Sequence, residues 1–184
     1  MLLYLVCVYY AVVFIVVEQK ICRATVSHME SALGKIRSIA DYQFGKGVGV
    51  RLFPENVDIV YSKATGRMRY LNLNGERLAT LRPTDGLLSL SITAAGLMTE
   101  KAEFARCFVT IQKDVSTFIA DGHDVFAAHV VKVDDAVRAK DEVIVVDEDG
   151  HVLAVGRALL SSVEMKAFKT GVAVKVRHGC TKES

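Results

Sequence analysis

The sequence predicts an α+β fold in which a mixed α/β module precedes a small β-barrel with short helices. Three observations predict it. An amphipathic helix pattern begins at Ser31. Short alternating runs follow it and are separated by the turn dipeptides Thr65-Gly66 and Asn74-Gly75. About five strand-like runs and two short helical patterns then share the last part of the chain, which is typical of a closed or partly closed barrel.

The composition agrees with a globular chain. Of 184 residues, 51% are hydrophobic and 24% are charged, and there are two prolines, which excludes a disordered tail or a collagen-like repeat. The 23 basic and 21 acidic residues leave a net charge of +2, so any nucleic-acid surface must be a local patch. The four cysteines lie far apart, which argues against a disulfide framework or a zinc site and favours a reduced, cytoplasmic protein.

Residues 1–17 are unusual because they contain no charged residue. The run is close to the shortest length that spans a membrane, and it lacks the flanking residues of a secretory signal. Three interpretations remain: a short membrane anchor, a segment packed in a subunit interface, or a functional start downstream near Met29. The downstream start is favoured, because the pattern from Met29 onward is complete without this run. Residues 1–28 are therefore treated as a separate segment.

Residues 29–103 form the first expected module. Its helix, Ser31–Tyr42, presents an apolar face and ends at Gly45, Gly47 and Gly49. These glycines either supply turns or let the chain pass close to a phosphate, but the helix precedes them, so a Rossmann site is excluded. Asn74-Gly75 predicts a tight hairpin. The remaining expected elements are strands at Val57–Tyr61, Arg67–Leu73 and Glu76–Leu81, a turn at Pro83–Gly86, an alternating run from Leu88 to Ile92, and a short helix at Ala94–Glu100.

Residues 104–184 form the second expected module, the barrel. Asp149-Gly150 predicts a hairpin, Gly156 a barrel corner or bulge, and Ser161 or Ser162 with Glu164 a capped helix. The expected strands are Phe108–Ile111, Val125–Val133, Glu142–Val146, Val152–Leu160 and Val172–Val176, and the expected helical segments are Val115–Ala120 and Val163–Phe168.

Local motifs in the second module carry a family resemblance. They are Gly122, Val125-Phe126-Ala127, Asp141-Glu142-Val143, Leu153 to Ala158, and Gly171 to Lys175 followed by His178-Gly179. Together they resemble a PUA domain. The upstream motifs Ala40 to Gly45, Thr65-Gly66-Arg67 and Leu78 to Arg82 are similar to the segment that precedes the PUA domain in archaeal tRNA-guanine transglycosylase, the archaeosine enzyme. The large catalytic barrel of that family, with its aspartates, is not among the matching segments.

This resemblance implies a pseudo-barrel that holds the acceptor stem and the 3′ CCA end of tRNA. We therefore expect a non-catalytic RNA-binding protein that acts as a tRNA-docking subunit or accessory factor for a transglycosylase catalytic subunit. One alternative is a PUA factor that acts on ribosomal RNA or in translation initiation. Another is a membrane-tethered interaction protein, which depends on residues 1–17; a membrane partner is not expected.

Charge is segregated within the second module. Residues 134–149 contain seven acidic and two basic residues, whereas residues 157–182 contain six basic residues and one acidic residue. Such a division is expected when one face meets phosphate, although acidic hairpins and basic helices are also ordinary surface features. The candidate RNA contacts, chosen from this division and the family motifs, are Gly122, His123, Phe126, Ala127, His129, Lys132, Arg157, Lys166, Lys169, Lys175, Arg177 and His178.

Several of these candidates have a structural alternative. Lys175 and Arg177 alternate on a strand and should share a face, so they are the leading phosphate contacts. Phe126 either stacks on a base or fills the barrel core, and the core is favoured. His123 and His129 either contact RNA or satisfy local hydrogen bonds, and Arg157 either contacts RNA or pairs with the acidic hairpin.

No catalytic constellation stands out. The five histidines lack metal-ligand spacing, and no Gly-x-Ser-x-Gly motif is present. Cys107 lies in an apolar run and is expected in the core, whereas Cys180 lies among basic groups without a recognisable partner. Asp41 and Asp85 lie near glycines and either act as an acid or base or cap a turn. We expect neither catalysis, nor a metal, nor a cofactor.

Overall fold

The computed structural model describes residues 32–101 and 105–183, so the expectations for residues 1–28 lie outside the described part of the chain. The chain divides into two compact units, residues 1–36 and 37–184. Of the first unit, only residues 32–36 are described, and they belong to a helix that runs over residues 32–44. Within the described ranges, no helix is both long enough and apolar enough to cross a membrane.

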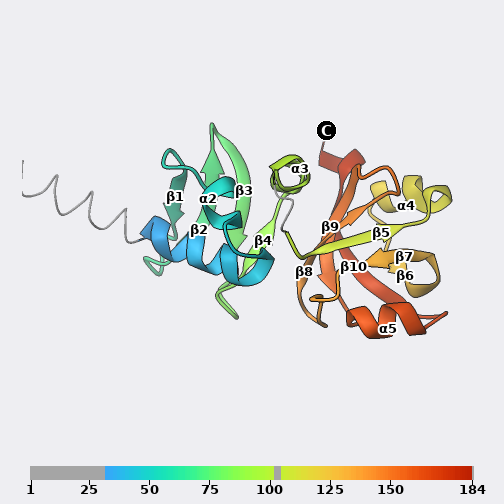
Figure 1. Ribbon diagram of the computed structural model, residues 1–184. Helices are drawn as coiled ribbons and strands as arrows, with labels where there is room; N and C mark the ends of the chain where they lie inside the picture. Colours follow the sequence, from blue (N-terminus) through green and yellow to red (C-terminus); the bar gives the residue numbers. More distant parts are fainter. Residues whose placement is uncertain (1–31, 102–104, 184) are drawn as a thin grey trace, which may run out of the picture. The chain divides into compact units, whose positions relative to one another are not determined.

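A four-stranded antiparallel sheet forms the first part of the larger unit (Figure 1). Its strands follow chain order: β1 (Asp58–Tyr61), β2 (Met68–Leu73), β3 (Glu76–Leu81) and β4 (Leu88–Leu90). Helix α2 (Val48–Leu52) precedes this sheet in the chain, and helix α3 (Ile92–Lys101) follows it. Asn74 and Gly75 have φ values of 53° and 87°, which confirms the predicted hairpin, because a two-residue turn of this hand needs positive φ at both positions.

The glycines after the helix over residues 32–44 are explained by packing. Gly45 and Gly47 have positive φ and turn the chain into α2. A Cβ at Gly49 would lie 2.2 Å from the Arg37 carbonyl oxygen, so only glycine permits this approach of α2 to the preceding helix. The Gly49 N–H also donates to Asp41 Oδ1 at 2.7 Å. The interpretation as turn residues is confirmed for Gly45 and Gly47, whereas Gly49 lies within α2 and is required by packing.

A six-stranded sheet curls into the barrel-like second part of the unit. Its order is β6-β10-β9-β8-β5-β7, and every neighbouring pair is antiparallel except β5 with β8. The strands are β5 (Phe108–Ile111), β6 (Val125–Phe126), β7 (Val130–Val133), β8 (Glu142–Val146), β9 (Val152–Ala158) and β10 (Val172–Gly179). The helical segments are η1 (Lys113–Val115), α4 (Ser116–Ala120), η2 (Ala127–His129), α5 (Ser162–Ala167) and η3 (Cys180–Glu183).

The single strand expected at Val125–Val133 is wrong. The 3₁₀ turn η2 divides this segment into β6 and β7, which lie at opposite ends of the strand order. A three-residue link between the two edge strands brings those edges together and bends the sheet into a partly closed barrel. The interior is filled by a cluster of buried side chains that includes Val109, Val125, Val145 and Val174.

Other local predictions are confirmed. The carboxylate of Glu164 accepts from the Ser161 N–H at 2.7 Å, and the Ser161 hydroxyl accepts from the Glu164 N–H, which makes a capping box at the start of α5. A Cβ at Gly156 would lie 2.4 Å from the Lys175 carbonyl oxygen, so β9 and β10 need glycine there. The register of β10 against β9 shifts beside it, between Val176 and His178.

Candidate nucleic-acid interface

The strongest candidate surface is the outer face of β9 and β10. Arg157 and Lys175 are direct cross-strand partners, and both are exposed. Opposite residues of an antiparallel pair project to the same face, so the register places two cations side by side. Lys175 Nζ contacts Asp124 Oδ2 at 2.8 Å, while Arg157 Nε donates to the Lys140 carbonyl oxygen at 3.1 Å. We use the name β9–β10 face for this surface, which comprises Arg157, Lys175 and the exposed apolar residues Phe126 and Leu159.

Phe126 belongs to this face. Its side chain is 49% exposed, so the expectation that it fills the barrel core is wrong. Alternation along β6 explains the difference: Val125 points into the barrel, so the next residue, Phe126, points to the surface, where it pairs with Val172. Leu159, at the end of β9, is also about half exposed. The face therefore combines cations with apolar side chains, as surfaces that bind unpaired bases do.

Gly122 and His123 lie in the turn after α4. Gly122 has a φ of 89°, and its N–H donates to the Ile119 carbonyl oxygen at 2.9 Å. The His123 ring meets the Phe118 ring edge-on with centroids 6.5 Å apart. Phe118 was not among the sequence candidates, although its side chain is 62% exposed. Its apolar, helix-like surroundings offered no signal that it would face solvent.

Three other candidates are placed by contacts within the protein, and a fourth, Lys132, lies exposed. Ala127 is buried and its N–H donates to the Gly171 carbonyl oxygen, so it presents no side chain to a ligand. His129 Nδ1 lies 3.0 Å from Gln112 Oε1, which is the local hydrogen bond considered from the sequence. Lys166 Nζ contacts Asp135 at 2.5 Å. Lys132 lies exposed on β7, at the opposite end of the strand order from β6.

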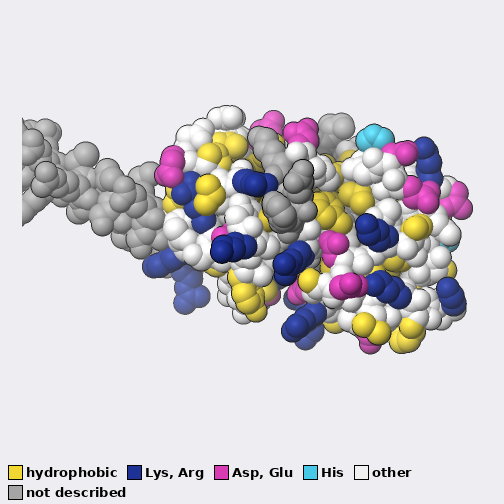
Figure 2. Space-filling model, viewed as in Figure 1, with side chains coloured by type: hydrophobic (Ala, Val, Ile, Leu, Met, Phe, Trp, Pro, Cys, Tyr) yellow, Lys and Arg dark blue, Asp and Glu magenta, His cyan; other side chains and the backbone are white. Residues whose placement is uncertain are grey.

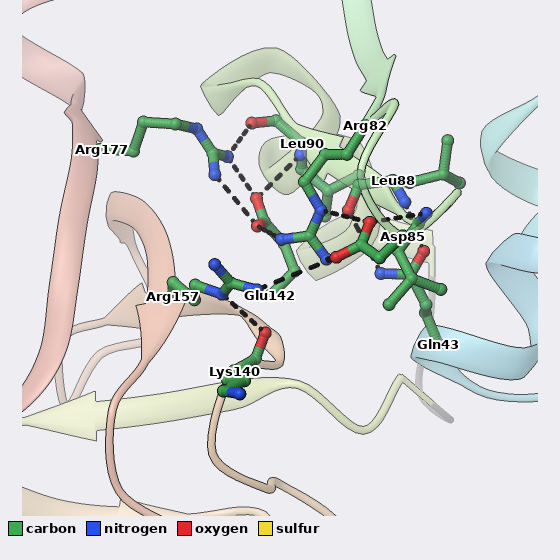
Figure 3. Close-up of polar contacts among 10 residues, drawn as sticks. Gln43, Arg82, Asp85, Leu88, Leu90, Lys140, Glu142, Arg157 and Arg177 are labelled. Carbon is green, nitrogen blue, oxygen red and sulfur yellow. Dashed lines mark hydrogen bonds and ion pairs between the residues drawn. The ribbon is translucent and has the colours of Figure 1, made fainter.

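The prediction that Arg177 is a phosphate contact needs correction. Its guanidinium donates to both carboxylate oxygens of Glu142, whose side chain is fully buried, and to the Leu90 carbonyl oxygen at 3.0 Å (Figure 3). The Leu90 N–H donates to Glu142 Oε1 at 2.9 Å. Arg177 therefore links β10 and β8 to β4, and its donors are used inside the protein. The exposed candidates Lys169 and His178 lie on either side of the β10 segment that carries Lys175.

A second group of polar contacts lies next to Glu142. Arg82 Nε donates to Asp85 Oδ1 at 3.1 Å, and the Leu87 N–H donates to the same oxygen. The Gln43 side chain pairs with the backbone of Leu88 on both its donor and acceptor sides. Figure 3 shows Asp85 between Arg82 and Arg157, which lies 3.8 Å from it. Asp85 thus holds a turn, as Asp41 does, and the capping interpretation of both residues is confirmed.

The charge segregation seen in the sequence is largely compensated in space. Asp135 pairs with Lys166, whose hydrogen bond and charge hold the pKa of Asp135 below its usual range. Glu142 pairs with Arg177. On the face visible in Figure 2, Lys and Arg side chains are interspersed with acidic and hydrophobic ones and form no single basic patch. Contacts with phosphate at this surface must therefore compete with internal ion pairs.

Asp147, Asp149 and His151 form the one group of metal-type ligands found among the described residues, with ligand atoms within 4.8 Å of one another. Each of them has a partner within the protein. Asp147 accepts from the backbone N–H groups of Asp149 and His151 and contacts His151 Nδ1, and Asp149 contacts Lys113 Nζ at 2.6 Å. Burial raises the pKa of Asp147, but the hydrogen bonds from His151 and Asp149 leave it below its usual range.

Cys107 lies in the core, as expected. Its thiol is buried, and this burial raises its pKa well above the ordinary value, with Asp134, Glu142 and Asp141 raising it further. A thiol held in its neutral form is a poor nucleophile. The side chain therefore serves packing beneath β5.

Two protein-family models match this chain, one for each part of the fold. A family model of the PUA domain matches residues 108–180, and a model of the patch-forming domain C2 of tRNA-guanine transglycosylase matches residues 34–104. Residues 34–104 are therefore similar to that C2 domain, and residues 108–180 are similar to a PUA domain.

The curated proteins that this chain resembles are tRNA-guanine(15) transglycosylases. The chain is 38% identical over 157 residues to the tRNA-guanine(15) transglycosylase of Methanobrevibacter smithii, a match that covers 85% of this chain and 24% of that protein. It spans about a quarter of the length of the curated relatives it matches and corresponds to their C-terminal part.

Two solved structures show the same fold at low sequence identity. A hypothetical protein from Pyrococcus horikoshii superimposes with a TM-score of 0.65 at 24% identity, covering 80% of this chain and 89% of its own. A conserved PUA domain protein from Thermoplasma acidophilum superimposes with a TM-score of 0.59 at 22% identity, covering 82% and 89%. The predicted fold class and the PUA resemblance are confirmed.

Proposed function

We propose that this chain binds RNA through its PUA domain and serves as a tRNA-docking subunit or accessory factor in transglycosylase-type base modification. One observation carries the proposal: the cross-strand cations Arg157 and Lys175 are exposed on β9 and β10, and Phe126 is exposed on the neighbouring strand β6. The similarity of the C2 and PUA domains together to the C-terminal part of tRNA-guanine(15) transglycosylases supports tRNA as the RNA.

The chemistry of the face suits this role. The Lys175–Asp124 pair is exposed on the lysine side, so its net stabilisation is small and a phosphate can replace the carboxylate at low cost. Phosphate contacts of this kind set the position of an RNA without reading its sequence. Phe126 and Leu159 offer apolar surface to an unpaired base, as at the 3′ CCA end. A transglycosylase catalytic chain then performs the base exchange, and this chain is not itself the catalyst.

The test is binding of the full chain to a fluorescently labelled tRNA, with and without its CCA end, across a salt series. We expect affinity to depend on the CCA end and to fall steeply with salt. Equal affinity for both tRNAs would refute the CCA contact, and no binding at low salt would refute RNA binding altogether.

A matched pair of variants locates the surface. Lys175→Gln removes one phosphate contact and should lower the slope of log affinity against log salt by about 0.9. Lys113→Gln removes an equally exposed lysine, paired with Asp149 in the same way but outside the β9–β10 face, and should leave the slope unchanged. Equal slopes for the two variants would show that the face is not the binding surface.

A further inference from the structure

A second cleft borders the Arg157 end of the β9–β10 face, because Glu142 in its lining is the cross-strand partner of Arg157. It has a volume of about 480 Å³ and is lined by the end of the helix over residues 32–44, the turn before β4, and the loop before β8. Its lining includes the aromatic residue Tyr42, the cations Lys46, Arg106 and Arg138, and the carboxylates of Asp41 and Asp141. A volume of this size accommodates one nucleotide.

Tyr42 is the most exposed of the large apolar side chains described, at 84%. It lies on the solvent side of a helix whose inward residues Ala40 and Phe44 are fully buried, so the core does not hold its ring. An isolated exposed aromatic residue is ordinary at a protein surface. Here the ring borders a cleft that also contains cations, which is the arrangement of a stacking platform for single-stranded nucleic acid.

The three cations of the cleft are not neutralised by carboxylates. Among the described residues, no acidic side chain lies within ion-pair distance of the Lys46, Arg106 or Arg138 side chains, whereas Lys113, Lys166 and Lys175 each have such a partner. The Asp41 and Asp141 carboxylates of the cleft wall each accept a backbone N–H and lie beyond ion-pair distance of these three cations. Within the described part of the chain, the charges of the three cations are therefore available to a ligand.

Each wall carboxylate accepts a hydrogen bond that the fold itself supplies. Asp41 Oδ1 accepts from the Gly49 N–H at 2.7 Å, and Asp141 Oδ2 accepts from the Arg138 N–H at 2.8 Å. Glu142, at the base of the cleft, is neutralised by Arg177. The other oxygens of Asp41 and Asp141 remain as acceptors for the amino group of a base.

We propose that this cleft binds an unpaired nucleotide of RNA, with the base stacked on Tyr42 and the adjoining phosphates held by Lys46, Arg106 and Arg138. The inference deepens the proposed function, on which it rests, by naming a second RNA contact whose lining comes both from the PUA domain and from the segment before it. It concerns a different set of residues from those of the β9–β10 face, so the two sites fail or succeed separately.

The chain contains no tryptophan, which allows a direct spectroscopic test. In the full-length Tyr42→Trp variant, the single indole lies at the cleft, and stacking of a base on it should quench its fluorescence. The probes are the tRNA of the first experiment and a ten-nucleotide oligoadenylate, with inorganic phosphate as the anion control. Tyr61→Trp, which places the indole on β1 outside the cleft, is the matched control.

We expect saturable quenching of the Tyr42→Trp variant by tRNA and oligoadenylate, none by phosphate, and none in the Tyr61→Trp variant. Binding of tRNA, seen by anisotropy, without quenching of the Tyr42→Trp variant would overturn the cleft and leave RNA docking intact. Quenching by oligoadenylate without CCA-dependent tRNA binding would support the cleft and refute docking. Quenching by phosphate alone would show an anion site and overturn the proposal.

Affinity gives a second readout. Tyr42→Ala should weaken oligoadenylate binding by about 5- to 100-fold, because loss of one base–aromatic stack has an effect of that size. Tyr42→Phe keeps the ring and should stay within about twofold of the unmodified chain. Equal affinity of the alanine and phenylalanine variants would exclude stacking at this position.

Discussion

Replacing Arg177 by Met removes the cation that neutralises a fully buried carboxylate. Arg177 donates to both oxygens of Glu142 and to the Leu90 carbonyl oxygen, and the methionine makes none of these bonds. In the variant, Glu142 keeps the Leu90 N–H at 2.9 Å, while Arg82 lies 4.0 Å away. The Arg177→Met variant should therefore be clearly less stable, because a buried charge is left without its partner.

The size of the loss follows from the burial of the two groups. Breaking a buried ion pair costs about 3–5 kcal/mol when both groups are inaccessible. The Glu142 side chain is 0% exposed but that of Arg177 is 32% exposed, so water can approach the carboxylate from the arginine side. We therefore expect a loss of about 2–3 kcal/mol in the free energy of unfolding, since solvent screening reduces the cost. For a chain of this size, Tm should fall by about 4–12 °C.

Urea unfolding followed by circular dichroism measures this loss. The control is Lys175→Met, two residues away on the same strand, where the lost pair with Asp124 is exposed and should contribute less than about 1 kcal/mol. The double variant Glu142→Leu/Arg177→Met also removes the buried carboxylate, while Arg82 keeps its pair with Asp85, so stability should recover relative to Arg177→Met. If Arg177→Met and Lys175→Met were equally stable, the assignment of Arg177 to a structural role would be wrong.

Further predictions concern local geometry and pH. Gly156→Ala should lower the free energy of unfolding by about 2 kcal/mol or more, because the new Cβ would lie 2.4 Å from the Lys175 carbonyl oxygen. Gly96→Ala, in open space on α3, should raise it by about 0.5–1 kcal/mol; the reverse order in thermal unfolding would contradict the packing. The Ser161 N–H and hydroxyl lower the pKa of Glu164, so its stabilising effect exists above the ordinary carboxyl pKa and disappears as pH falls through the lowered value. Glu164→Gln should therefore be less stable than the unmodified chain at pH 7 and equal to it near about pH 2, and a difference that persists in acid would refute the capping-box contribution.

Features that depend on a few neighbouring residues were predictable from the sequence. The hairpin at Asn74-Gly75 follows from the positive φ that this dipeptide tolerates, and the capping box at Ser161 and Glu164 follows from their spacing. Each feature depends only on residues that lie within about four positions of one another along the chain. The tertiary structure keeps both local conformations unchanged.

The candidate surface was predictable only in part. The alternation of Lys175 and Arg177 suggested one shared face, but the register shift of β10 beside Gly156 and the buried carboxylate of Glu142 gave the two cations different partners. The exposure of Phe126 depends on which residue of the short strand β6 points inward, and that residue is Val125. Tyr42, although part of a family motif, and Arg106 were not among the candidate RNA contacts, because their cleft is formed by segments that are distant along the chain.

The sequence by itself determined the class of fold, the main turns and caps, and the resemblance to a PUA domain and to the segment that precedes it in archaeal tRNA-guanine transglycosylase. These depend on short-range patterns of polarity and backbone preference, which act before distant segments meet. Only the tertiary structure decided which charged groups face solvent. The Leu90 carbonyl oxygen that binds Arg177 comes from a strand 87 residues away in the chain. Such pairings depend on how whole strands are registered and packed, so no local pattern encodes them.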